Sequence, residues 1–243
     1  MTMRFLIAMI IVLGTALLSV SYAQSWGEFI GKVVVEWLPD GRNMKLVEQF
    51  AYVDPRGRKW NAPAGSVVNG ASIPQFAWSI IGGPFEGKYR EASVIHDVAC
   101  KNKDRPWQDV HEAFYTAMLA SGVEILRAKV IYAAVYHFGP RWGRSMNFSN
   151  VPMTSVQSKV ADVRATAGKD DEVLSEVRPR PPASGGPLRR SPQQEMADVS
   201  VRVVPRPTVL TQKDFEVLRA EIEKNDVPLE VIQAFRTSDN PIR

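Results

Sequence analysis

Residues 88–138 decide the fold of this chain, KYREASVIHDVACKNKDRPWQDVHEAFYTAMLASGVEILRAKVIYAAVYHF. Apolar side chains recur in this stretch at intervals of three and four residues, which is the spacing of amphipathic helices. The pattern predicts three helices, over Lys88–Asn102, Pro106–Ser121 and Glu124–Phe138. The last of them is apolar almost all round from residue 130 onward, so we expect it to be the buried one.

The residues in front of these helices favour strands. Two runs rich in valine and aromatic residues, Phe29–Leu38 and Met44–Val53, flank the pair Asp40-Gly41. An Asp-Gly pair between two such runs is typical of a β-hairpin. Lys59–Ala62 is expected to add a third short strand. The fold class is therefore α+β, with a small antiparallel N-terminal sheet or hairpin followed by a three-helix core.

The composition limits the classes of partner. Among 243 residues, 30 basic and 26 acidic side chains leave a formal charge of +4. Both signs alternate along the chain, so we expect no nucleic acid partner. Cys100 is the only cysteine, which excludes an internal disulfide and any multi-cysteine metal site.

The first 23 residues resemble a secretory signal peptide. Arg4 provides a positive charge ahead of the apolar run Phe5–Val20, and Ser21-Tyr22-Ala23 offers small residues where a signal peptidase cuts. The run covers 16 residues, fewer than the roughly 20 that a membrane-spanning helix needs. We therefore expect an exported protein, periplasmic or extracellular, with an uncleaved N-terminal membrane anchor as the alternative.

The second half of the chain differs in composition. Residues 149–214 contain no aromatic side chain, and residues 147–210 are rich in proline, which argues against a packed core. The sequence therefore predicts four segments: a signal peptide at 1–23, a globular domain at 24–146, a flexible Pro-rich linker at 147–210 and a helical hairpin at 211–237. Thr211 and Asp214 resemble a capping box at the start of that hairpin. A protein partner is expected to bind through the linker or the hairpin.

His96 and His111 each lie on an apolar helix face by their spacing, so their imidazoles approach each other if the two helices pack together. Asp97 is rotated roughly 100° away from His96, toward Lys101. Two histidines with an adjacent carboxylate can bind a metal or orient a water. The alternative is two unrelated core histidines, each hydrogen-bonded to a backbone carbonyl. Cys100, one turn after His96, is expected to be a buried and inert thiol.

Several motifs follow one another in this region: Pro63-Ala64-Gly65, Val68-Asn69-Gly70-Ala71-Ser72-Ile73-Pro74, His96-Asp97 and Phe114-Tyr115-Thr116-Ala117-Met118. Over about residues 35–142 they resemble the bacterial and phage family called domain of unknown function 1353. The resemblance implies a small, phage-related α+β domain with no established activity. The chain departs from the family pattern where Asn69 replaces an acidic loop residue, Cys100 replaces a tyrosine and His111 replaces an acid.

The His96-Asp97 helix followed by a second helix is also similar to the secretory phospholipases. In that group the histidine activates a water, the adjacent aspartate binds calcium, and an acid on the next helix orients the histidine. The likeness implies that His96 is the catalytic base, Asp97 the calcium ligand and His111 the orienting residue. The substrate would be a phospholipid or another envelope ester. The residues that complete the calcium site would be the loop positions Asn69, Gly70 and Ser72.

Two hypotheses about function therefore stay open. The first is an exported hydrolase that acts on an envelope substrate through His96 and Asp97. The second is a non-catalytic envelope or phage-derived structural or interaction protein, in which this pair only holds two helices together. A transition-metal site of His96, His111 and Asp97 is a smaller third hypothesis. A cleft that reaches the two histidines would favour the hydrolase, and a sealed pair would favour the structural protein.

Overall fold

A computed structural model of the whole chain describes residues 25–70, 76–78, 82–83, 87–168, 171–181, 194–206 and 209–237. The leader at 1–23, the loop residue Ser72 and the Pro-rich residues 182–192 lie outside these ranges. Export therefore stays a prediction. Within the described ranges, no helix has the length and the apolar run that crossing a bilayer requires.

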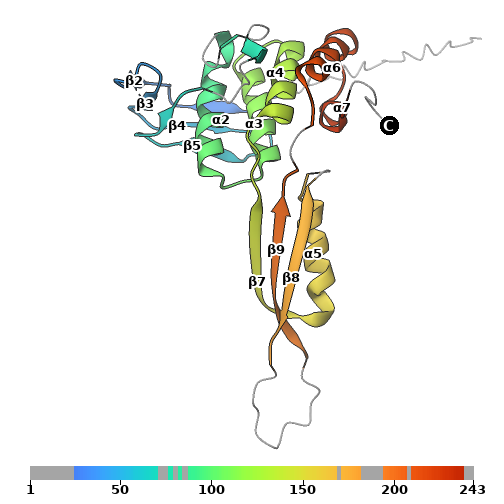
Figure 1. Cartoon of the computed structure of the whole chain (residues 1–243). Coiled ribbons are helices and arrows are strands. Elements are labelled where there is room, and N and C mark those ends of the chain that lie inside the picture. Colours follow the sequence, from blue (N-terminus) through green and yellow to red (C-terminus); the bar gives the residue numbers. More distant parts are fainter. Residues whose placement is uncertain are drawn as a thin grey trace, which may run out of the picture.

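The described chain forms two parts (Figure 1). We call residues 25–142 together with 209–237 the head, and residues 143–206 the arm. The head holds the main hydrophobic core, and the arm has a smaller core of its own. The arm extends away from the head as a narrow sheet with one helix beside it (Figure 1). The α+β class expected from the sequence is confirmed.

The N-terminal part of the head contains two small antiparallel sheets. The first has the order β1 (Glu28–Ile30), β4 (Phe50–Val53), β5 (Lys59–Ala62), and the second has the order β2 (Val35–Trp37), β3 (Met44–Leu46), β6 (Val67–Val68). Trp37 pairs with Met44 across the Asp40-Gly41 turn, so the predicted hairpin is confirmed. In β5, Trp60 and Ala62 are buried while Lys59 and Asn61 are exposed, because successive side chains of a strand point to opposite faces.

The three predicted helices are present within a few residues of their expected limits. They are α2 (Arg90–Asn102), which the short turn η1 (Gly87–Tyr89) precedes, α3 (Trp107–Ala120) and α4 (Ile125–Phe138). Lys103 ends α2 in a left-handed conformation with φ 58°, which stops the helical hydrogen bonding. Residues 128–137 of α4 are all buried, as its apolar circumference predicts.

The C-terminal hairpin is present but belongs to the head. It consists of α6 (Gln212–Asn225) and α7 (Leu229–Ala234), and the capping box between Thr211 and Asp214 is formed. Both helices pack on α4. The Phe215 ring lies 6.1 Å from the Phe138 ring and 5.6 Å from the Phe76 ring. The globular part therefore does not end at residue 146, because the hairpin completes its core.

The prediction of a flexible linker at 147–210 is wrong for the described residues of that range. These residues form strands and a helix, which make up most of the arm. The arm contains β7 (Arg144–Pro152), η2 (Met153–Ser155), α5 (Val156–Ala165), β8 (Glu172–Pro179) and β9 (Met196–Val204), with the strand order β7-β9-β8. The buried side chains of β9 are Ala197, Val199, Val201 and Val203. Valines at alternate positions build most of this core, and the half-buried Phe148 packs against it. The low aromatic content of the segment was therefore a misleading signal.

Candidate functional site

His96 of α2 and His111 of α3 meet where the two helices pack together. The Nε2 atom of His96 lies 2.8 Å from the Nδ1 atom of His111. The side chains are almost completely buried, with 1% of His96 and none of His111 exposed. Both histidines therefore lie on the apolar helix faces where the sequence pattern places them.

The direction of this hydrogen bond follows from its surroundings. His111 Nε2 lies 3.1 Å from the carbonyl oxygen of Pro140. A carbonyl only accepts, so Nε2 of His111 carries the proton, and Nδ1 of the neutral ring accepts. His96 then donates from Nε2 and keeps a lone pair on Nδ1. We call this chain of Pro140, His111 and His96 the histidine relay.

Burial keeps the relay uncharged. Removal from water lowers the pKa of His96 from 6.5 to about 3. Burial, and then the neighbouring His96, lower the pKa of His111 well below its ordinary value. The surroundings are aromatic: the Phe114 ring lies 4.6 Å from the ring of His96, and the Trp107 ring lies 5.5 Å from that of His111. Both imidazoles are therefore neutral at pH 7.

Cys100 lies beside the relay, one helical turn after His96. Its Sγ atom is 3.5 Å from Nε2 and 3.8 Å from Nδ1 of His96. Burial, and then the charge of Asp97, raise the pKa of the thiol to about 12, so it stays protonated and is a poor nucleophile. The ligand atoms of His96, Cys100 and His111 lie within 4.8 Å of one another. The sequence predicted that Cys100 lies one helical turn after His96, but it did not assign the thiol to the site.

Asp97 points away from this cluster and holds a loop. Its Oδ2 atom accepts the backbone N–H of Asn69 at 2.7 Å and lies 3.4 Å from Nζ of Lys101. The N–H of Gly70 also bonds to this carboxylate. Burial raises the pKa of Asp97, although the bonds from Asn69, Lys101 and Gly70 act in the opposite direction. The structure thus places Asn69 and Gly70 beside α2, where Asp97 anchors them.

These surroundings do not fit calcium. The ion takes six to eight oxygen ligands, whereas an oxygen of Asp97 already accepts an N–H and faces an ammonium group. Ser72, the remaining loop residue of the implied site, is outside the described ranges. We therefore derive no catalytic step through calcium.

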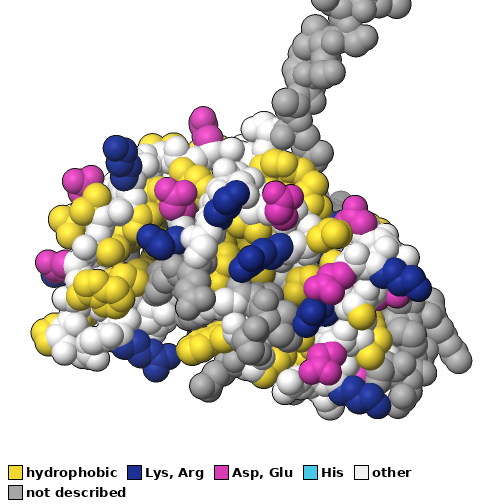
Figure 2. Space-filling model, turned by 90° about the horizontal axis from the view of Figure 1, so that it is seen from above, with side chains coloured by type: hydrophobic (Ala, Val, Ile, Leu, Met, Phe, Trp, Pro, Cys, Tyr) yellow, Lys and Arg dark blue, Asp and Glu magenta, His cyan; other side chains and the backbone are white. Residues whose placement is uncertain are grey.

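The surroundings of α2 show where a ligand has access. A cavity of about 230 Å³ between α2 and β5 is lined on the helix by Ile95, Ala99 and Asn102. His96, Cys100 and His111 do not line it, because they lie between α2 and α3. Figure 2 shows basic and acidic side chains interspersed on the face in view, with no histidine among the described residues there. The relay is thus sealed in the packed interior.

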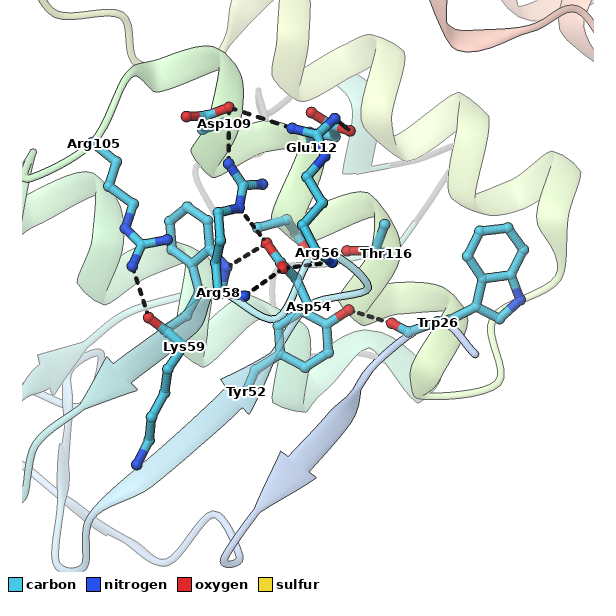
Figure 3. Close-up of polar contacts among 12 residues, drawn as sticks. Trp26, Tyr52, Asp54, Arg56, Arg58, Lys59, Arg105, Asp109, Glu112 and Thr116 are labelled. Atoms are coloured by element: carbon cyan, nitrogen blue, oxygen red, sulfur yellow. Dashed lines mark hydrogen bonds and ion pairs between the residues drawn. The ribbon is translucent and has the colours of Figure 1, made fainter. Parts of the chain in front are cut away.

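A second polar network, which the sequence analysis did not anticipate, fixes the strands to α3 (Figure 3). The buried carboxylate of Asp54 accepts Nε1–H of Trp60 at 3.0 Å and Nε–H of Arg58 at 2.7 Å. Burial alone would raise the pKa of Asp54, but the bonds from Trp60 and Arg58 outweigh it and lower the pKa. Arg58 continues to Asp109 of α3, with Nη1 3.1 Å from Oδ1. The turn between β4 and β5 is thereby fixed to the helix that carries His111.

Comparison with known proteins confirms the first resemblance. Residues 44–135 match the family described as "Protein of unknown function (DUF1353)". These residues include α2, α3, the two histidines and Cys100. The arm and the C-terminal hairpin lie outside them.

Two curated relatives from Sinorhizobium fredii are each described as an "Uncharacterized protein". The protein y4jT is 44% identical over 134 residues, which are 54% of this chain and 40% of that protein. The protein y4iH is 37% identical over 151 residues, which are 58% of this chain and 63% of that protein. This chain therefore spans less than two thirds of either relative. No solved structure matches it.

Proposed function

We propose that this protein is an exported, non-catalytic interaction protein of the cell envelope or of phage origin. The observation that carries the proposal is the sealing of the relay, since His96 and His111 are 1% and 0% exposed. A catalytic base must come within hydrogen-bond reach of its substrate. The rings instead contact each other and the aromatic residues around them.

In this proposal the relay acts as a structural tie. It connects α2 through His96, α3 through His111, and the segment after α4 through Pro140. Each hydrogen bond satisfies a polar atom in an apolar core, where an unsatisfied group costs about 1–3 kcal/mol. The relay therefore favours one relative position of the three helices, because buried hydrogen bonds are strong in surroundings of low dielectric constant.

The arm supplies the surface for a partner. β9 lies in the middle of its sheet, so β7 and β8 are the edge strands, and α5 packs on β9 and β8. The uncovered face carries polar side chains, among them Glu176 and Ser200, which pair across the strands. Edge strands offer unpaired N–H and C=O groups to another chain. The partner expected for such an edge is a protein that presents an extended segment.

Site-specific photo-crosslinking in the producing cell tests this role of the arm. A photoreactive residue replaces Leu174 of β8 in one variant and Val217 of α6 in the matched control, and these side chains are 41% and 39% exposed. We expect a discrete protein adduct from position 174 and none from position 217. Adducts of equal yield at both positions, or none at position 174, would contradict the proposal.

Ester hydrolysis is the second candidate function, and one observation favours it. The relay leaves the lone pair of His96 on Nδ1, where it could take a proton from an attacking water. The substrate would be a phospholipid or another ester of the envelope. Purified protein without the leader, incubated with mixed lipid vesicles, should then release fatty acid. Release that survives the change His96→Ala would remove this candidate.

A further inference from the structure

We infer that His96, Cys100 and His111 form a buried binding site for one cuprous ion. The three ligand atoms lie within 4.8 Å of one another. This inference goes beyond the proposed function and does not depend on the arm or on hydrolysis. Two histidines and a cysteine are also a donor set that copper takes in proteins with trigonal geometry.

Two of the three distances between ligand atoms are within about 0.7 Å of those of a trigonal site. With metal–nitrogen and metal–sulfur bonds of about 2.0 and 2.3 Å, trigonal geometry separates two nitrogens by about 3.5 Å and a nitrogen from the sulfur by about 3.7 Å. Sγ of Cys100 lies 3.5 Å from Nε2 of His96. Nε2 of His96 lies 2.8 Å from Nδ1 of His111. Binding therefore requires the imidazoles to part by about 0.7 Å. It also requires Sγ of Cys100 and Nδ1 of His111, which belong to the cluster that lies within 4.8 Å, to adopt a separation of about 3.7 Å.

His111 is already in the tautomer that a metal requires. Its Nε2–H donates to the carbonyl oxygen of Pro140 at 3.1 Å, so its Nδ1 lone pair points toward His96. Such a hydrogen bond from the second nitrogen commonly orients a metal-bound histidine. When the ion binds, the Nε2 proton of His96 moves to Nδ1, and the thiol proton of Cys100 passes to the solvent. The net reaction releases one proton, and no oxidation state changes.

Charge balance favours a monovalent ion. A cuprous ion and one thiolate sum to zero, whereas a zinc ion would leave a buried net charge of +1. Among the described residues, the cluster contains no carboxylate, since Asp97 is turned toward Asn69 and Lys101. An uncompensated charge is costly in such an apolar interior.

The number of ligand atoms and the softness of the thiolate also favour the cuprous ion over zinc. Structural zinc sites almost always have four ligands, and this cluster offers three side chains. Thiolate is a soft ligand that suits monovalent copper. Phe114 and Trp107 pack against the two imidazoles, which leaves little room for a water molecule as a fourth ligand.

The test uses the full chain without its leader, under anaerobic conditions, with cuprous ion supplied as a complex with a coloured chelator. We expect the protein to remove one ion per chain from the chelator. X-ray absorption at the copper edge should report one sulfur and two nitrogen donors. Because Cys100 is the only cysteine, bound copper should also slow alkylation of the thiol under partly denaturing conditions. Absence of stoichiometric binding, or preferential binding of zinc, would overturn the inference.

Matched variants assign the ligands. Cys100→Ser is nearly isosteric and should weaken cuprous binding at least about tenfold. His137→Gln is the control, since His137 is also buried and bonds to the carbonyl oxygen of Ile232 at 2.7 Å but lies outside the cluster. The control should bind copper like the unmodified chain. Equal affinity of Cys100→Ser and the unmodified chain would contradict the assignment. If Cys100→Ser does not fold, the alkylation and absorption measurements on the unmodified chain still decide.

Discussion

The imidazoles of His96 and His111 share a 2.8 Å hydrogen bond in a core that solvent does not reach. The bond has a direction, because the carbonyl oxygen of Pro140 fixes the proton on Nε2 of His111. The same geometry is compatible with a structural tie, a base with a lone pair on Nδ1, or two ligands for a soft ion. Stability, activity and metal content separate these roles.

Replacing His96 by alanine should destabilise the fold. The change leaves Nδ1 of His111 without its donor in a sealed site, which costs about 1–3 kcal/mol of unfolding free energy. Urea denaturation of the variant and the unmodified chain measures this loss. A variant as stable as the unmodified chain but without hydrolytic activity would instead support the catalytic base. His96→Gln is the matched variant, because glutamine keeps an N–H donor and most of the side-chain volume but lacks the imidazole. Comparing its stability with that of His96→Ala separates the two effects.

The buried neutral histidines should make the protein sensitive to acid. Burial lowers the pKa of His96 from 6.5 to about 3 and that of His137 to about 4. Below about pH 6.5 the unfolded chain binds protons that the folded chain excludes, so stability is full above this pH and falls as the pH drops toward 3. The slope is at most about 1.4 kcal/mol per pH unit for each histidine. Urea denaturation across this range should show a shallower slope in His96→Gln, and an equal slope would contradict the assignment.

Phe215 should be essential for the stability of the head. Its ring is fully buried between Phe76 and Phe138, so Phe215→Ala should cost about 3–5 kcal/mol. Val217→Ala on the same helix is the control, since Val217 is 39% exposed and its change should stay within about 0.5 kcal/mol. Thermal denaturation measures both variants. A small effect of Phe215→Ala would show that packing of the hairpin on α4 contributes little to the stability of the head.

Asp54 should hold the turn between β4 and β5 against α3. Asp54→Ala removes the acceptor of the buried Trp60 Nε1–H and an ion-pair partner of Arg58. We expect a loss of about 1.5–3 kcal/mol, the range for hydrogen bonds to charged groups. Asp40→Ala is the control, since Asp40 also accepts backbone N–H groups in a turn but is exposed. Equal losses of unfolding free energy in the two variants would show that burial does not strengthen the contribution of Asp54 to stability.

The leader should be removed after Ala23. Phe5–Val20 is shorter than the roughly 20 residues that a membrane-spanning helix needs, and small residues precede the expected cleavage site. Mass spectrometry of the protein from the producing cells should find Gln24 at the N-terminus, in the periplasm or the medium. Ala23→Arg should block cleavage and retain the leader. An intact N-terminus in the unmodified protein would support the membrane anchor instead.

Local patterns in the sequence were sufficient for the helices of the head and for one hairpin. The limits of α2, α3 and α4 follow from apolar spacing, because a helix satisfies its hydrogen bonds within a single segment. The Asp40-Gly41 turn sets the pairing of β2 and β3, because a short turn brings two neighbouring strands together in one register. The helical faces of His96 and His111 were likewise fixed by spacing alone.

Tertiary structure decided the fold of the arm, the direction of Asp97 and the closing of the histidine site, because each depends on contacts between distant parts of the chain. In the arm, Arg144 of β7 pairs with Val203 of β9, and such pairing across a long separation leaves little local signal. The direction of Asp97 toward Asn69 depends on where the loop lies. The sequence alone placed two histidines on apolar helix faces. Only the packing of α2 on α3 brought them and Cys100 together and closed them off from water, because burial is a property of the whole core.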